Sequence, residues 1–151
     1  PVDCRVVAVR GVSDRPAGSV VAWGDGYDII GPDAVAPGGI AEGSVDDLLA
    51  ARIAAGWPAM GAEIVPGETI PAETGVVPFA VSFTKGCYPG QELVERMDSR
   101  GAVPPRSLVV VDVSAGARPG DPYVVDGAPV GVLTSVAGTR GLAVVRRPSA
   151  G

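Results

Sequence analysis

One eight-residue segment combines a thiol, an ammonium, a phenol and two further polar side chains: Lys85-Gly86-Cys87-Tyr88-Pro89-Gly90-Gln91-Glu92. It places the Cys87 thiol on a glycine-flanked loop directly before a predicted helix. Unpaired N–H groups at a helix N-terminus, together with the ammonium of Lys85, favour a thiolate over a thiol. Gly86 and Gly90 permit backbone conformations closed to other residues and let a ligand approach closely. The pattern is typical of a nucleophilic or redox-sensitive cysteine.

The alternative for Cys87 is inert packing, because free cysteines are among the most buried residues of proteins. Cys4, in an apolar strand-like run, is expected in the core. The chain contains no His, which excludes Cys–His dyads, Ser–His–Asp triads and histidine zinc sites. Two cysteines supply neither a disulfide scaffold nor the four ligands of an iron–sulfur cluster, so we expect no metal site.

Composition narrows the classes of partner. Lys and Arg number 12 against 17 Asp and Glu, a formal charge of −5, which argues against a nucleic-acid or anionic-membrane binder. No apolar run approaches the roughly 18 residues of a membrane helix, and no signal peptide is visible, so we expect a cytoplasmic protein. The chain opens abruptly on a strand-like run at Pro1, as a piece of a longer protein would.

Two helices and a hairpin are predicted in the first two thirds of the chain. Apolar runs on either side of Gly24-Asp25-Gly26 predict a β-hairpin. Ser44 is a good N-cap for a helix that ends at Gly56, with Asp46 and Asp47 in its first turn. A second helix is expected from about residue 90 to 99, and the Pro- and Gly-rich stretch between the helices should be irregular.

Short β-branched runs separated by glycines make up the last third of the chain. Several such strands at this spacing predict a small barrel or sandwich; they are expected at residues 108–113, 123–125, 129–134 and 142–145. We therefore place a domain boundary near residues 102–106, giving a first domain over residues 1–104 and a second over residues 105–151.

The pattern Lys-Gly-Cys-Tyr-x-Gly-Gln-Glu at residues 85–92 resembles the signature of the YgfZ family at all seven specified positions. These folate-binding proteins are related in fold to the aminomethyltransferase, or T-protein, of the glycine cleavage system. Further stretches resemble the family or its superfamily at residues 23–28, 52–61, 70–73, 81–84, 95–97 and in the tail. The resemblance implies an α+β fold: the C-terminal part of an aminomethyltransferase-like folate-binding body, followed by a small antiparallel β-barrel.

The resemblance also implies a function. Proteins of the family bind tetrahydrofolate and support the assembly or repair of iron–sulfur enzymes and the tRNA modifications that depend on them. Carried over, Cys87 is the functional thiol, and its pocket is shaped by Lys85, Tyr88, Gln91 and Glu92. The implied partners are folate, iron–sulfur proteins or their assembly factors, and the missing N-terminal half of the same protein.

A folate site needs a cation for the glutamate tail, an aromatic wall, and a carboxylate for the N–H groups of the pterin ring. Within or beside the matched segments, the candidates are Arg52, Glu73, Arg96, Asp25 and Tyr27. Three of them have a structural alternative. Arg52 suits a solvated helix face, Glu73 an exposed loop, and Asp25 a turn.

Two other functions remain open. An aminomethyltransferase would act on a lipoyl-bound aminomethyl group, but the T-protein lacks the cysteine motif at this place. A non-catalytic scaffold would use Cys87 only for packing. Whether the thiol turns over a substrate is also open, and any contact of Cys87 with a cluster would have to be transient or shared with a partner.

Overall fold

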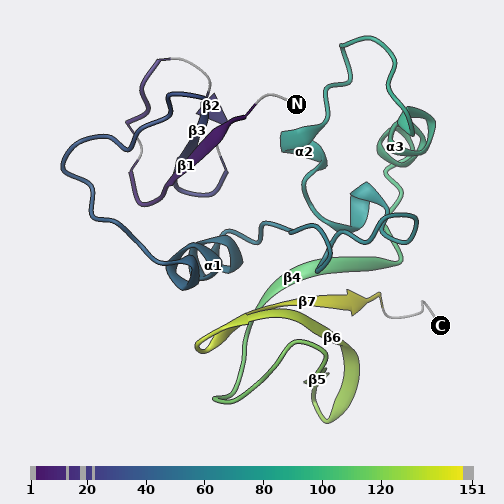
Figure 1. Cartoon of the computed structure of the whole chain (residues 1–151). Coiled ribbons are helices and arrows are strands. Elements are labelled where there is room, and N and C mark those ends of the chain that lie inside the picture. Colours follow the sequence, from purple (N-terminus) through teal and green to yellow (C-terminus); the bar gives the residue numbers. More distant parts are fainter. Residues whose placement is uncertain (1–2, 13, 18–19, 22, 148–151) are drawn as a thin grey trace. The chain divides into compact units, whose positions relative to one another are not determined.

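The computed structural model describes residues 3–12, 14–17, 20–21 and 23–147, and the chain divides into two compact units, Pro1–Trp57 and Pro58–Gly151 (Figure 1). The first unit contains β1 (Arg5–Val9), β2 (Val20–Val21), β3 (Tyr27–Gly31) and α1 (Val45–Ala54). The second contains η1 (Pro71–Glu73), α2 (Val77–Ala80), α3 (Gln91–Ser99), β4 (Arg106–Asp112), β5 (Pro122–Val125), β6 (Ala128–Ala137) and β7 (Arg140–Arg146). The chain is thus of the mixed helix-and-sheet class.

The sheet of the N-terminal unit is antiparallel, with β3 between β1 and β2. The pairing of β2 with β3 confirms the predicted hairpin. In its turn, Gly24 has a φ of 61°, and a Cβ there would lie 2.9 Å from the Cβ of Ala55 at the end of α1. Glycine therefore lets this turn approach the helix. Cys4 precedes β1 and is exposed, so its predicted place in the core is wrong: the residue lies outside the paired strand.

An arginine–tryptophan cluster, formed by Arg10, Trp23, Asp28 and Trp57, packs beside this sheet. The Arg10 guanidinium lies 3.4 Å from the centroid of the Trp23 ring and donates to Oδ1 of Asp28 at 2.7 Å. Trp23 donates from Nε1 to Oδ2 of the same carboxylate at 3.0 Å, and its ring stacks on Trp57 with centroids 6.0 Å apart. The cluster thus links the sheet to the chain that follows α1.

Helix α1 begins as predicted, with Ser44 as its N-cap. The Asp47 N–H donates to Oγ of Ser44, and the Asp47 carboxylate accepts from the N–H and hydroxyl of Ser44, which completes a capping box. Gly56, with a φ of 65°, follows the last turn.

The capping box predicts a titration that can be measured. Its hydrogen bonds from the Ser44 backbone and side chain lower the pKa of Asp47 below the ordinary 3.8. Because the folded pKa is lowered, the stabilisation of α1 is present above pH 3.8 and is lost as pH falls through the folded value. Carboxyl ¹³C titration of Asp47 should therefore give a midpoint below 3.8 that moves back toward 3.8 in Ser44→Ala. An identical midpoint in the two proteins would contradict the capping box.

The C-terminal unit is built on a four-stranded antiparallel sheet in the order β4-β7-β6-β5. Each of the four predicted runs coincides largely with one of these strands. Val111, Leu133 and Ala143 form a core on one face, with Tyr123 and Val136 packed against it. Because side chains alternate along a strand, the fully buried Leu142 belongs to the opposite face, where it is paired with Ser135.

Two carboxylates of the irregular segment before α3 bind side chains on the sheet face that carries Leu142. Ser135 donates to the buried Glu63 at 2.6 Å, and Arg106 of β4 forms an ion pair with the buried Glu73 at 2.8 Å. Both interactions join the segment to the sheet within one unit. The predicted domain boundary at residues 104–105 lies inside this unit, and the division into domains 1–104 and 105–151 stays a prediction.

Candidate functional site

The cysteine motif folds as a tight turn that leads into α3. Residues 88–91 form a type II β-turn, in which the Gln91 N–H donates to the Tyr88 carbonyl at 3.2 Å. Gly90 occupies the position that requires a positive φ, with φ 82° and ψ 1°. Pro89 stands before it, where the fixed φ of proline is favoured. The motif's proline and second glycine therefore specify the backbone that follows Cys87.

Gln91 holds both backbone groups of Tyr88. Its N–H binds the Tyr88 carbonyl, and its side-chain Oε1 accepts from the Tyr88 N–H at 3.3 Å. The Gln91 Nε2 in turn donates to Oε1 of Glu95, one helical turn further along α3. The turn is thus tied to the helix through one amide side chain.

Cys87 is exposed in this arrangement. Its side chain is therefore not part of the core of its own unit, which weakens the packing alternative. The Lys85 ammonium lies 5.1 Å from the centroid of the Tyr88 ring, whereas the Tyr88 hydroxyl is buried without a hydrogen-bond partner among the described residues. Glu92 is exposed in the first turn of α3. Within the described part of the chain, no three His, Cys, Asp or Glu side chains gather as a metal site would require.

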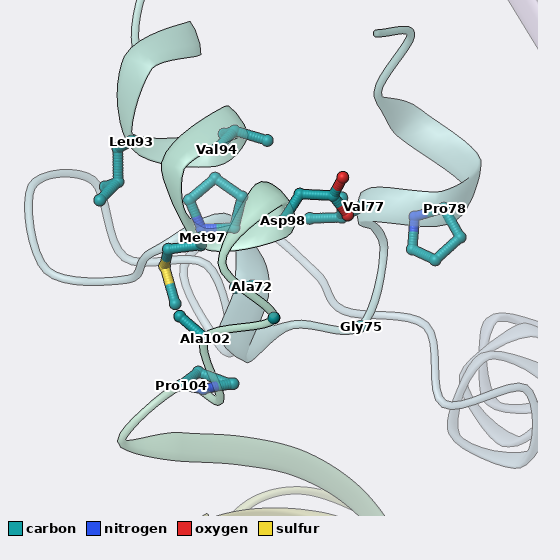
Figure 2. A pocket seen from close by; sticks show the side chains of 12 residues that line it. Ala72, Gly75, Val77, Pro78, Leu93, Val94, Met97, Asp98, Ala102 and Pro104 are labelled. Atoms are coloured by element: carbon teal, nitrogen blue, oxygen red, sulfur yellow. The ribbon is translucent and has the colours of Figure 1, made fainter.

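A pocket of about 320 Å³ lies between α3, the turn after η1 and the first residues of α2 (Figure 2). Its lining is largely apolar, with Val94 and Met97 from the helix and Val77 and Pro78 from α2. Asp98 is the one ionisable side chain among the described residues that line it, and Figure 2 shows its carboxylate on the side of α3 that faces α2. An apolar pocket with a single polar group is typical of a site for a small ring-shaped ligand.

A second pocket, of about 270 Å³, lies against the sheet face that carries Arg106 and Thr134. Two of its three carboxylates are already used in the fold, because Glu63 binds Ser135 and Glu73 binds Arg106, and the third, Glu68, is exposed. This pocket is therefore a weaker candidate for a ligand.

The expected folate contacts are spread over both units. In the N-terminal unit, Tyr27 is buried in the sheet at 2% exposure, Asp25 is exposed in the turn, and Nη1 of Arg52 donates to the Trp57 carbonyl at 2.9 Å. In the C-terminal unit, Glu73 is buried in its ion pair with Arg106, and Arg96 is exposed in the last turn of α3. Among the described residues no hydrogen bond or ion pair joins Glu73 to Arg96, and the folate role of these five residues stays a prediction.

Reasoning from the sequence missed several side chains around the motif. Glu95 could have been found, since it stands four residues after Gln91 on a predicted helix. Asp98, on the same helix, carried no signal that it would line a pocket. Arg106 could not be linked to Glu73, because 33 residues separate them and only the folded sheet brings them together.

Comparison with known proteins adds two findings. Residues 106–150, less than a third of the chain, match the family model described as the C-terminal beta-barrel domain of CAF17. The match is to a YgfZ/CAF17 family domain. It covers all four strands of the C-terminal sheet and agrees with the small antiparallel β-domain predicted for this part of the chain.

A stretch of 59 residues, 39% of the chain, is 41% identical to a chloroplastic protein of Arabidopsis thaliana that is provisionally named a transferase. The stretch covers 13% of that protein, so the chain spans only a small part of this relative. Both findings are consistent with the YgfZ/CAF17 family, to which the motif at residues 85–92 had already pointed. No helix among the described residues is long and apolar enough to cross a membrane.

Proposed function

We propose that this chain is the C-terminal part of a tetrahydrofolate-binding, YgfZ-type protein that supports the assembly or repair of iron–sulfur enzymes and the tRNA modification that depends on them. One observation carries the proposal: within the motif that matches at seven positions, residues 88–91 form an ordered turn directly after an exposed Cys87. The matched C-terminal domain supports it from another part of the chain.

In this proposal Cys87 is the functional thiol. The turn fixes the backbone on its C-terminal side, and its exposure leaves Sγ open to a partner protein. Since Cys87 has no further metal-ligating cluster around it among the described residues, its contact with an iron–sulfur cluster would be transient or shared with the client. The ammonium of Lys85 adds positive charge to the loop two residues before the thiol.

The pocket beside α3 supports folate binding in part. Its apolar lining suits a flat ring, and the Asp98 carboxylate can accept hydrogen bonds from the amino and N–H groups of a pterin. Arg96, exposed on the same helix, is a cation for the glutamate tail. When bound, tetrahydrofolate would supply a carrier for one-carbon units. The residues named here would bind and orient it.

An aminomethyltransferase is the second candidate, favoured by the Arabidopsis relative that is provisionally named a transferase. Such an enzyme would release ammonia and methylene-tetrahydrofolate from a lipoyl carrier loaded with the aminomethyl group. The cysteine motif argues against this activity, since the T-protein lacks it at the corresponding place. Ammonia release from a loaded lipoyl carrier separates the two functions directly.

The proposal predicts a loss of function in Cys87→Ala. The full-length protein would be expressed in cells that lack their own YgfZ-type protein, and the activity of an iron–sulfur enzyme would be measured in extracts at matched protein levels. We expect the unchanged protein to restore the activity and Cys87→Ala to restore less than a tenth of it, because the variant lacks the thiol.

Cys4→Ala is the matched control, since Cys4 is the second exposed cysteine of the chain. It should restore the activity as fully as the unchanged protein. Equal rescue by Cys87→Ala would show that the thiol is dispensable and would overturn its role. Failure of the unchanged protein would overturn the maintenance function, and the lipoyl-carrier assay would then decide for or against the second candidate.

A further inference from the structure

We propose that Glu95 is a positioning residue for Cys87, and that it acts by fixing which end of the Gln91 amide faces the turn. The inference rests on the proposed role of Cys87 for its functional meaning, but not for its geometry. Glu95 lies outside the eight motif residues, and none of the comparisons assigns it a role.

The hydrogen-bonding capacity of a carboxylate sets the direction of the contact between Gln91 and Glu95. An ionised Glu95 can only accept, so the group that Gln91 presents to it must be the Nε2 donor. The amide is planar, and its other end is then Oε1. This oxygen meets the N–H of Tyr88, a donor, at 3.3 Å. The hydrogen-bond chain from Tyr88 through Gln91 to Glu95 therefore has one direction, which the hydrogen-bond acceptor on Glu95 sets.

The N–H that Gln91 accepts belongs to the peptide bond between Cys87 and Tyr88. Because a peptide group is planar, holding this N–H fixes the plane of the peptide group between Cys87 and Tyr88. The carbonyl of Tyr88 is held on its other side by the Gln91 N–H at 3.2 Å. The orientation of the peptide group after Cys87 thus depends on the Gln91 side chain. The orientation of the Gln91 amide depends in turn on Glu95.

Burial agrees with this chain of contacts. Gln91 and Glu95 are both partly buried on one side of α3, whereas Glu92, between them in sequence, is exposed. An amide exposed to water could exchange its two ends at little cost. If the partly buried Gln91 amide exchanged its two ends, it would lose the hydrogen bonds to both Tyr88 and Glu95.

The test compares substitutions that keep or reverse the acceptor at position 95. Glu95→Gln removes the charge but retains an acceptor for the Nε2 of Gln91. Glu95→Lys offers only a donor, so Gln91 must turn its Oε1 toward the ammonium and its Nε2 toward the Tyr88 N–H. We expect hydrogen exchange of the Tyr88 amide, measured by NMR in the full chain, to be at least tenfold faster in Glu95→Lys and within threefold of the parent in Glu95→Gln.

A double variant keeps the test valid if Glu95→Lys perturbs the helix. In Gln91→Glu combined with Glu95→Lys, the new carboxylate can accept from both the Tyr88 N–H and the ammonium, so slow exchange at Tyr88 should return. A second readout is the rate of Cys87 alkylation by iodoacetamide in a Cys4→Ala background. In Glu95→Lys the rate should move toward that of a short peptide of residues 85–92, and in the double variant it should return to the parent value.

Each outcome decides the inference. Unchanged Tyr88 exchange in Glu95→Lys, equal acceleration in Glu95→Gln, or no recovery in the double variant would overturn it. These results do not depend on what Cys87 does in the cell. If they come out as expected while Cys87→Ala restores the iron–sulfur enzyme fully, the proposed function fails and the positioning by Glu95 stands.

Discussion

Replacing Arg10 with Ala is expected to destabilise the N-terminal unit by about 3–5 kcal/mol, the range found when one partner of a buried ion pair is removed. The side chains of Arg10 and Asp28 are only 12% and 15% exposed, so the substitution would leave the Asp28 carboxylate largely shielded from water and without its partner. After the substitution, the Asp28 carboxylate would retain one of the hydrogen bonds described within the arginine–tryptophan cluster, the one donated by Nε1 of Trp23.

Arg10 also donates hydrogen bonds to two backbone carbonyls. Its Nη1 donates to the carbonyl of Val9 at 2.7 Å and to that of Tyr27 at 2.9 Å, the residues that pair at the end of β1. Its loss removes these donors together with the cation–π contact to Trp23, worth about 1–2 kcal/mol when partly desolvated. Because the sheet described for this unit is small, with three strands, we expect this loss to unfold much of the described part of the unit at room temperature.

Tryptophan fluorescence measures this effect selectively, because the two Trp residues of the chain, Trp23 and Trp57, both belong to the N-terminal unit. In urea titrations of the full chain, the fluorescence transition should move to much lower urea in Arg10→Ala. Arg5→Ala, a change of the same kind at an exposed position of β1, should stay within about 0.5 kcal/mol of the parent. A loss below 1 kcal/mol in Arg10→Ala would contradict the role assigned to the cluster.

Reasoning from the sequence identified the elements whose conformation is specified by a few neighbouring residues. The capping residue Ser44, the glycines of the hairpin turn, and the Pro89-Gly90 pair each specify a backbone conformation through their own chemistry. The β-branched runs after residue 106 needed only alternation and turn residues to be seen as strands. Such signals act over a few residues and survive in whatever fold surrounds them.

The interactions that reasoning from the sequence did not identify are those that depend on register between distant elements. Arg10 meets Asp28 only because β1 and β3 pair so that Val9 faces Tyr27. Asp28 had been noted merely as part of a resembling turn. The candidate site shows the same division: its turn and the Gln91–Glu95 pair are local, whereas the Asp98 pocket requires η1 and α2 to pack beside α3.

Glu73 illustrates the limit most clearly. For this loop carboxylate the sequence offered two interpretations, an exposed side chain or a folate contact. In the structure it is 6% exposed and accepts two hydrogen bonds from Arg106, at 2.8 and 2.9 Å. Nothing in the local sequence around either residue indicates a partner 33 positions away.

This ion pair leads to the second prediction, that Arg106→Ala destabilises the C-terminal unit by about 2–3 kcal/mol, less than a fully buried pair because the arginine remains partly exposed. The side chain of Arg106 is 40% exposed, whereas that of Glu73 is 6% exposed. Removal of the guanidinium also frees the Glu68 carbonyl, which accepts from Nη2 at 3.2 Å. The irregular segment that carries η1 would then be held to the sheet mainly by Glu63 and Ser135.

Hydrogen exchange of the Leu142 and Ala143 amides reports on this unit, since both residues are fully buried in β7. At about 1.4 kcal/mol for each factor of ten, the expected loss corresponds to exchange roughly 30- to 150-fold faster under conditions where global unfolding controls exchange. The hydrogen bond and charge of Glu73 raise the pKa of Arg106 above its ordinary value. A group whose pKa is raised by folding stabilises the protein at every pH below its pKa in the unfolded state, and this stability is lost only as pH rises through its pKa in the folded state. The destabilisation by Arg106→Ala should therefore be constant between about pH 6 and 9.

Arg140→Ala provides the matched control in the same sheet. Arg140 lies 3.8 Å from Asp112, and both side chains are largely exposed, at 57% and 92%. An exposed pair of this kind contributes about 0–1 kcal/mol, so exchange at Leu142 should change less than fivefold. If Arg106→Ala behaved like Arg140→Ala, the Glu73 pair would contribute no more than a surface ion pair. Residues 58–76 would then need another reason to remain on the sheet, and Glu73 would be released for the ligand contact that the family resemblance implied.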